Sequence, residues 1–279
     1  MPSPDDRPAL NGQRSSGGAA AAVSLREVSL TYGGNRRLGG VFGGTDTVDA
    51  LLGIDADIAG GEFVTIVGPS GCGKSTLLRL VAGFARPTGG EVAVAGEPVT
   101  GPGPDRGVVF QQPRLFPWLN LRRNVEFGLR MTGAPAARRR SRTAELLDLV
   151  GLSESAARLP HELSGGMQQR AAIARALAPG PRILLMDEPF AALDALTRER
   201  LQEELRRIWR RTGTTILFVT HSVDEAVVLG TRIIALSRRP GRIVLDETSA
   251  PSAEEDPHAH PGFPALREKI AATVRAAAA

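Results

Sequence analysis

The stretch Gly68-Pro69-Ser70-Gly71-Cys72-Gly73-Lys74-Ser75 determines the fold class of this chain. It has the pattern G-x-x-x-x-G-K-S, in which glycines allow a tight loop and the backbone N–H groups of that loop surround phosphate groups. An apolar run at residues 62–67 precedes it. A helical pattern at residues 74–83, apolar on one side, follows it. This order predicts an α/β fold that binds a nucleotide.

Each side chain of the loop has an expected task. Lys74 places a positive charge near the β- and γ-phosphates, and the Ser75 hydroxyl is a ligand for Mg²⁺. Cys72 is the only cysteine, so an intramolecular disulfide is excluded, and we expect it to fill space. The nucleotide-binding residues predicted here are Gly68, Pro69, Ser70, Gly71, Cys72, Gly73, Lys74, Ser75 and Thr76.

A second strand pattern ends in two carboxylates. Four apolar residues at 183–186 predict a buried strand, and Asp187 and Glu188 follow directly. Because α/β sheets bind ligands at the carboxyl ends of their strands, Asp187 is expected to hold Mg²⁺. Glu188 adjoins the metal without needing to bind it, so it can polarise an attacking water molecule. A solvated glutamate at a strand end is the competing interpretation.

The stretch Leu163-Ser164-Gly165-Gly166-Met167-Gln168 opens a helical pattern at residues 167–178. Two adjacent glycines let a backbone approach phosphate closely, and a helix start offers free N–H donors with a partial positive charge. An ordinary glycine-rich helix start would show the same pattern. Ser164, Gly165 and Gly166 are therefore candidate phosphate contacts, and their meaning depends on the motifs around them.

Composition limits the classes of function. The chain has 279 residues, of which 42% are hydrophobic and 23% charged, as expected for a soluble globular protein. No apolar run reaches the roughly 18–20 residues that span a bilayer, and the N-terminus does not have the pattern of a secretion signal. The net charge is +4, carried almost entirely by arginine. The basic cluster at 138–142 has no interleaved aromatic residues, so we expect a solvated surface and no nucleic-acid partner.

The chain divides into three regions by its patterns. Residues 1–22 are expected to be a flexible tail, residues 23–246 the nucleotide-binding domain, and residues 247–279 an extension that ends in a helix at 264–278. Within the domain, a Gly-rich loop interrupts the first strands at 33–44, and an inserted helical block covers about 113–178. The strands expected in a parallel sheet are residues 183–187, 215–220 and 233–237, with a helix at 197–211.

Together these motifs resemble the ATP-binding subunits of ABC transporters, whose signature is the L-S-G-G stretch found at residues 163–166. The resemblance covers roughly residues 23–246. It implies a P-loop NTPase (RecA-like) core with an N-terminal antiparallel β subdomain and an inserted α-helical subdomain that carries the signature. It also implies ATP and Mg²⁺ as cofactors, and Glu188 as the general base.

Three further residues match family motifs. Gln111, after a strand at 107–110, matches the glutamine that senses Mg²⁺ and the attacking water, although Gln112 is adjacent. Asp194 matches a loop along the dimer interface, where Ala192 replaces a frequent hydroxyl residue. His221 matches the switch histidine that holds the γ-phosphate. In the family, Ser164, Gly165 and Gly166 of one subunit close over the ATP of the other, so a second, identical subunit is the expected partner.

Tyr32, the only tyrosine, is a candidate for stacking on adenine, and a buried core tyrosine is the alternative. The segment Leu115, Phe116, Pro117 and Trp118 follows the glutamine loop. Its aromatic and apolar side chains suggest a socket for a helix of a membrane permease. The alternative interpretation is that these side chains pack inside the helical block. The permease is expected as a separate subunit, because the chain has no membrane span.

The resemblance is greatest to importers of taurine, alkanesulfonates or nitrate, through residues 101–111, 115–118 and 237–242. It implies an ATPase at the cytoplasmic face of the cell membrane, which drives import of a small anionic solute and is indirectly linked to an extracytoplasmic solute-binding protein. The alternatives are a soluble ABC-type ATPase of DNA repair or translation, and a regulator that binds ATP without turnover.

Overall fold

The computed structural model describes residues 22–33 and 47–278. The N-terminal tail expected at 1–22 and the Gly-rich loop expected at 33–44 lie outside the described residues, apart from Ala22 and Gly33.

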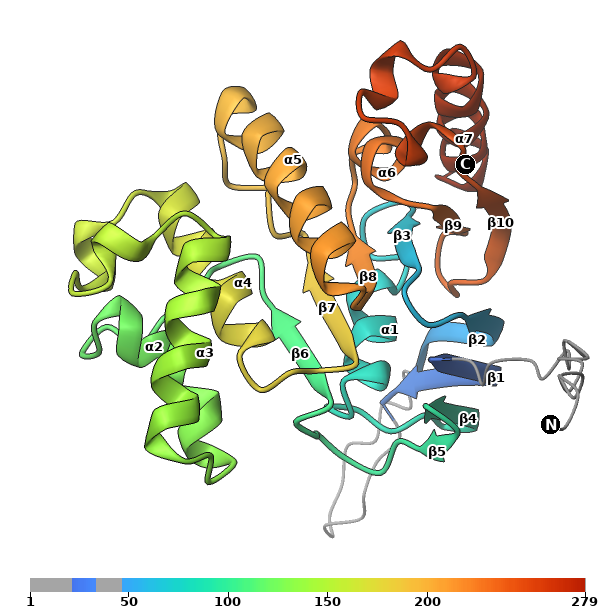
Figure 1. Cartoon of the computed structure of the whole chain (residues 1–279). Helices are drawn as coiled ribbons and strands as arrows, with labels where there is room; N and C mark the ends of the chain where they lie inside the picture. Colours follow the sequence, from blue (N-terminus) through green and yellow to red (C-terminus); the bar gives the residue numbers. More distant parts are fainter. Residues whose placement is uncertain (1–21, 34–46, 279) are drawn as a thin grey trace, which may run out of the picture.

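Two β-sheets form the centre of the fold (Figure 1). The antiparallel sheet contains, in spatial order, β2 (Val48–Ile58), β1 (Val23–Tyr32), β4 (Gly89–Val94) and β5 (Glu97–Pro98). The second sheet contains β10 (Ile243–Thr248), β9 (Arg232–Leu236), β3 (Phe63–Val67), β8 (Thr215–Val219), β7 (Ile183–Asp187) and β6 (Arg106–Val109). Its strands are parallel except for β10, which pairs antiparallel with β9.

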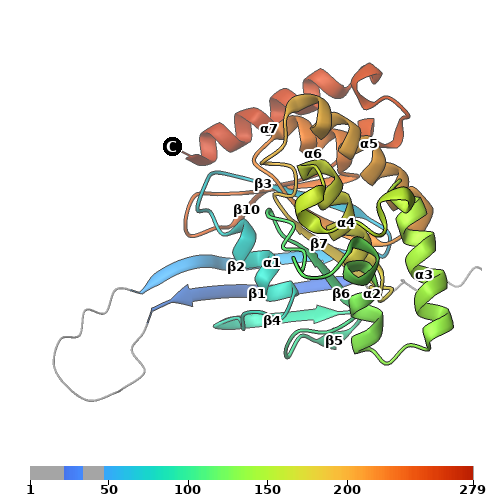
Figure 2. The ribbon, with the colours of Figure 1, turned by 90° about the vertical axis from the view of Figure 1, so that its left-hand side faces the viewer.

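The apolar character of the central strands reflects the helices and sheets that cover their faces. β3 and β8 are buried at every position, because helices or the other sheet cover both of their faces. Helix α1 (Lys74–Val81) lies between the two sheets, as Figure 2 shows. The opposite face of the parallel sheet is covered by α4 (Gly165–Leu177), α5 (Ala195–Thr212) and α6 (Val223–Leu229). The predicted α/β fold class with an N-terminal antiparallel sheet is confirmed.

The inserted block stands to one side of the sheets (Figure 1). Its helices are α2 (Leu121–Met131), α3 (Ala136–Leu149) and α4, with short 3-10 turns at Ser153–Ser155 and Pro160–Glu162. The chain enters this block between β6 and β7. Residues 113–120 are not helical, so the segment that contains Trp118 reaches α2 as an irregular loop.

The C-terminal segment is part of the core. β10 continues to Thr248, two residues past the boundary expected at Asp246. Helix α7 (Phe263–Ala278) then packs on α6 and β9, and it places Phe263 and Ile270 in the same hydrophobic cluster as the parallel sheet. Removing this segment would expose that face of the core.

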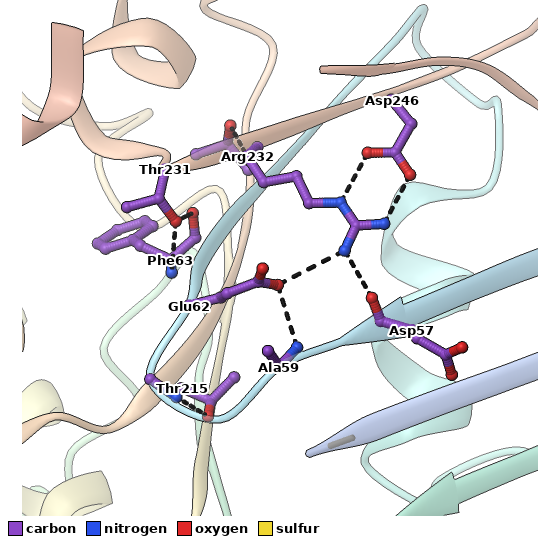
Figure 3. Close-up of polar contacts among 10 residues, drawn as sticks. Asp57, Ala59, Glu62, Phe63, Thr215, Thr231, Arg232 and Asp246 are labelled. Atoms are coloured by element: carbon purple, nitrogen blue, oxygen red, sulfur yellow. Dashed lines mark hydrogen bonds and ion pairs between the residues drawn. The ribbon is translucent and has the colours of Figure 1, made fainter. Parts of the chain in front are cut away.

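A charged cluster ties the two sheets together (Figure 3). The Arg232 guanidinium on β9 donates to both carboxylate oxygens of Asp246 on β10, at 2.6 and 2.7 Å. It also donates to the backbone oxygen of Asp57, at the end of β2, at 2.5 Å and lies 3.5 Å from the carboxylate of Glu62. The hydrogen bond to Asp246 raises the pKa of Arg232, so the guanidinium stays charged. It holds the antiparallel sheet against the edge of the parallel one.

The order of the parallel strands decides which loops meet. β3 lies between β9 and β8, and β8 lies beside β7. In register, Ile66 of β3 is opposite Val219 of β8, and Val219 is opposite Asp187 of β7. The phosphate loop, Asp187 and the residues after β8 therefore leave the sheet at one edge, where α/β folds bind ligands.

Candidate functional site

The phosphate loop is wedged between β2 and the loop from β9 to β10. Gly68 has φ +152°, and a Cβ there would lie 2.8 Å from the backbone oxygen of Leu236. Gly73 has φ +105°, and a Cβ there would lie 2.6 Å from Leu51 Cδ2. Glycine is therefore required at both positions, by conformation and by space. Gly73 is the N-cap residue of α1. The first turn of that helix has neither a side-chain cap nor an acidic residue, which leaves its N–H groups for an anion.

Lys74 is held inside this loop. Its Nζ donates to the backbone oxygens of Gly68, at 2.8 Å, and Pro69, at 3.1 Å, and the residue is only 6% exposed. Burial raises the pKa of the neighbouring Cys72 thiol, which keeps it protonated and unreactive. A fixed ammonium group next to the uncapped N-terminus of α1 fits the phosphates of a nucleotide.

The expected metal ligands come together although they are far apart in sequence. Ser75 Oγ donates to Asp187 Oδ1 at 2.8 Å. Both line a cavity of about 370 Å³ together with Gln111 and Gln112. A hydroxyl, a carboxylate and an amide oxygen are hard donors that suit Mg²⁺, which takes few protein ligands when phosphates and water supply the rest. In the described part of the chain no three His, Cys, Asp or Glu side chains cluster as a metal site.

Gln111 and Gln112 are both exposed and both line the cavity, so the structure does not separate the two candidates.

Glu188 and His221 face each other across the edge of the sheet. His221 Nδ1 lies 3.3 Å from Glu188 Oε2, and the two side chains are 62% and 28% exposed. Glu188 has φ +45°, a left-handed conformation that strains a residue with a Cβ. Its N–H donates to the backbone oxygen of Val219 at 3.0 Å, which holds this turn against β8. The turn keeps the carboxylate at this edge of the sheet, directly after Asp187.

Tyr32 lies at the surface and is not a core residue. Its side chain is 43% exposed, and its hydroxyl is 3.5 Å from Thr76 Oγ1. The ring thus stands beside the first turn of α1, close to where the phosphate loop ends. This position suits stacking against a base, although the Gly-rich segment that follows Tyr32 lies outside the described residues.

The signature residues open onto a different cavity. Ser164 caps α4 by accepting a hydrogen bond from the Met167 N–H at 3.3 Å. The adjacent cavity, of about 340 Å³, is lined by Ser164, Gly166, Met167, Arg170, Thr197, Arg200, Leu201 and Glu204. It contains no residue of the phosphate loop. Gly165 is exposed, whereas Gly166 is buried, and a Cβ at Gly166 would lie 2.8 Å from Thr197 Cγ2 on α5.

Asp194 caps the next helix. Its carboxylate accepts a hydrogen bond from the Thr197 N–H at 3.0 Å, which lowers its pKa. The side chain is exposed. Leu193, just before it, is the side chain nearest to a Cβ at Gly165, at 3.7 Å. The loop before α5 and the start of α4 therefore form one continuous surface.

The segment at residues 115–118 divides into a half-buried part and an exposed part. Leu115 packs against the core, and the ring of Phe116 lies 4.5 Å from that of Phe127. Pro117 and Trp118 are exposed, Trp118 by 73%. Local packing thus accounts for Leu115 and Phe116, while Pro117 and Trp118 remain available to a partner.

Asn124 organises this segment, and sequence analysis missed it. The residue is fully buried, accepts a hydrogen bond from the Phe116 N–H at 2.8 Å and donates to the backbone oxygens of Phe116 and Leu119. It lies on the apolar side of α2, together with Leu121, Val125 and Leu129. A single amide within an apolar helix face is the signal that would have identified it.

Comparisons with known proteins agree with this geometry. A family model described as "ABC transporter" matches residues 51–191. The taurine import ATP-binding protein TauB of Roseobacter denitrificans is 47% identical over 231 residues, 81% of this chain and 86% of the relative. An uncharacterized ABC transporter ATP-binding protein of Methanocaldococcus jannaschii, MJ0412, is 54% identical over 225 residues, 79% of this chain and 80% of the relative.

Solved structures give the same result. The dimeric structure of MJ0796, a bacterial ABC transporter cassette, matches with a TM-score of 0.68 and 36% identity, over 81% of this chain and 98% of that one. A dimeric post-hydrolysis state of MJ0796 bound to ADP and Pi matches with a TM-score of 0.67, at the same identity and coverage.

Proposed function

The chain belongs to the ABC transporter family and is an ATPase, and we propose that it drives import of a small anionic solute through separate permease subunits. The observation that carries the proposal is the pairing of Ser75 with Asp187 beside Glu188 and His221, while the signature opens onto a separate cavity. One subunit therefore carries both halves of an ATP site, the phosphate-binding half and the signature half, at two separate places on its surface.

The residues at the sheet edge divide the chemistry among them. Backbone N–H groups of the phosphate loop and Lys74 bind the phosphates and offset their charge. Ser75 and Asp187, with Gln111, would hold Mg²⁺, which when bound neutralises charge on the transferring phosphate. Glu188 takes a proton from the attacking water. His221 holds that carboxylate in place and offers an N–H to the phosphate.

The second half of each site comes from another copy of the chain. Ser164, Gly165 and Gly166 of one subunit would approach the ATP bound by its partner, and Asp194 would lie along the contact. The dimeric MJ0796 structures support this arrangement, as does the absence of phosphate-loop residues from the signature cavity. Because removing one donor from such a site typically slows reactions about 10²–10³-fold, hydrolysis should require the closed dimer.

Transport requires further subunits. Within residues 22–33 and 47–278, no helix is long and apolar enough to cross a bilayer. Pro117 and Trp118 are exposed and would contact a permease helix, with the subunit on the cytoplasmic face of the membrane. The relatives named as taurine import proteins support an anionic sulfonate or a similar solute, which an extracytoplasmic binding protein would deliver. No observation favours a role in DNA repair or translation.

The proposal is tested by purifying the subunit and measuring ATP hydrolysis per molecule as a function of protein concentration. Hydrolysis that increases with concentration, until the dimer saturates, is the expected result. Copurification with the permease subunits, followed by ATP-dependent uptake of taurine, an alkanesulfonate or nitrate into vesicles, then tests transport. A rate per molecule that does not depend on concentration would refute the shared site, and uptake without ATP consumption would refute the transport role.

A further inference from the structure

We propose that the Arg198–Glu225 pair couples the two ATP sites of the dimer, by linking the signature support of one site to the switch histidine of the other. The inference rests on the proposed dimeric ATPase. It concerns two residues to which neither the sequence patterns nor the site described above assigns a role. The link runs through the first turn of α5, which contacts both halves of the machinery in one subunit.

The first turn of α5 touches the signature. Gly166 is buried against Thr197, and the side chain of Leu193 is the closest neighbour of the space beside Gly165. Thr197 and Leu201 also line the cavity below Ser164. A shift of the signature toward a phosphate group of the partner site would therefore be felt directly by residues 193–201. Packed interfaces transmit such shifts because they have little free volume.

Arg198, the next residue in the same turn, contacts both the loop before α5 and helix α6. One guanidinium nitrogen donates to the backbone oxygen of Leu193 at 2.8 Å, which fixes the loop before α5. Its Nε lies 3.6 Å from Glu225 Oε1 on α6. This nitrogen is buried, and among the described residues it has no hydrogen-bond partner at normal distance. A movement of a few tenths of an ångström toward Glu225 would form a charge-assisted hydrogen bond.

Glu225 connects this contact to the switch histidine. It is 7% exposed, and its Oε2 accepts a hydrogen bond from Thr220 Oγ1 at 2.5 Å. The same Thr220 oxygen accepts from the N–H of Ser222 at 3.0 Å. Thr220 and Ser222 flank His221, so the carboxylate holds both ends of the turn that presents the imidazole. His221 in turn lies 3.3 Å from Glu188.

The resulting chain of contacts starts at Gly166, which would approach the ATP bound by the partner subunit. It ends at Glu188, the general base for the ATP bound by its own subunit. A buried carboxylate with an arginine at a marginal distance is suited to a two-state element, since losing either partner leaves the other incompletely paired. Coupling energies between sites typically change affinity or population about 5–150-fold. We therefore expect hydrolysis to depend cooperatively on ATP, and that cooperativity to depend on this pair.

The test compares Glu225→Gln with Asp224→Asn. Glu225→Gln keeps the shape and a hydrogen-bond acceptor for Thr220 but removes the charge that attracts Arg198. Asp224, its neighbour on α6, pairs with Arg267 on α7 at 2.6 Å at the surface, so Asp224→Asn removes an equal charge from the same helix without touching α5. ATP hydrolysis is measured over a range of ATP concentrations, and ATP binding by its stabilisation of the monomer.

For the wild type and Asp224→Asn we expect a Hill coefficient approaching two. For Glu225→Gln we expect a coefficient near one and a turnover at least fivefold lower, with ATP binding unchanged. If Glu225→Gln does not fold, Arg198→Gln, on the more exposed partner, is measured in its place and should give the same loss. A folded variant that keeps the wild-type Hill coefficient would refute the coupling role.

Mixed dimers separate this inference from the proposed function. Adding Glu188→Gln subunits to wild type should lower activity more steeply than the fraction of wild-type subunits, because each site needs its partner site. When both kinds of subunit also carry Glu225→Gln, activity should decrease linearly with the fraction of Glu188→Gln subunits. A wild type with no ATPase activity would refute the proposed function itself. A wild type with activity but the same curve in both backgrounds would refute only the coupling.

Discussion

A methyl group added at Gly165 should separate the catalytic role of the signature from its role in packing. Gly165 is exposed, and a Cβ there would be 3.7 Å from Leu193 Cδ2, an ordinary contact. Since alanine in a helix is more stable than glycine by about 0.5–1 kcal/mol, Gly165→Ala should fold at least as stably as the wild type. The methyl group would nevertheless occupy the surface that a phosphate of the partner site must approach.

The matched variant is Gly166→Ala, one residue further along the same helix. Its Cβ would lie 2.8 Å from Thr197 Cγ2, so α5 must move or the side chain must turn. Overpacking of this kind costs about 1–3 kcal/mol. Since both variants gain the same helix preference, Gly166→Ala should be less stable than Gly165→Ala by about 1–3 kcal/mol. For a chain of this size that is a difference in Tm of roughly 2–12 °C.

Thermal unfolding and steady-state ATP hydrolysis measure the two effects independently. Gly165→Ala is expected to keep its Tm and its ATP binding and to lose hydrolysis by about 10²-fold, the cost of one missing donor in such a site. Normal hydrolysis by Gly165→Ala would show that the signature does not approach phosphate. A Tm of Gly165→Ala below that of Gly166→Ala would show that the packing against Thr197 is wrongly assigned.

Five substitutions test other parts of the protein. Lys74→Ala should abolish the increase in Tm that ATP produces, because it removes the charge fixed inside the phosphate loop, and an unchanged increase would place the nucleotide elsewhere. Glu188→Gln should bind ATP, stop turnover and elute as a dimer in gel filtration with ATP; turnover at the wild-type rate would mean that another group is the base. Trp118→Ala should reduce transport and leave stability and isolated ATPase activity intact. Asn124→Ala should lower stability by about 1–3 kcal/mol, because the Phe116 N–H and the backbone oxygens of Phe116 and Leu119 lose their partner; equal stability losses would assign Trp118 to the core. Burial raises the pKa of Glu225 above its ordinary value of 4.5. The stability that the protonated carboxyl contributes is therefore complete below about pH 4.5 and is lost as the pH rises through the raised pKa. Between acid and neutral pH, Glu225→Gln should lose less free energy of unfolding than the wild type, and an equal pH dependence of the two free energies, measured by denaturant unfolding, would contradict this.

Local patterns predicted most of the regular structure. The strand expected at 183–187 is β7, and those expected at 215–220 and 233–237 agree with β8 and β9 to within one residue. These strands could be predicted because a strand that is covered on both faces has a continuously apolar sequence. The prediction of the helical block was less accurate, because residues 113–120 form an irregular loop that hydrogen bonds with Asn124 hold in place. A hydrogen bond between a helix and the loop before it leaves no periodic pattern.

The amino-acid sequence by itself determined the strands and helices, the conformation of the phosphate loop and the chemical types of the candidate groups. These depend on backbone geometry and on neighbours within a few residues. Only the tertiary structure decided that Ser75 meets Asp187, that Gly166 faces α5 and that Arg198 reaches Glu225. Such contacts join residues that are distant in the chain, and they exist because the order and register of the parallel strands bring particular loop ends to one edge. A contact of this kind depends on the whole core, so no short stretch of sequence contains it.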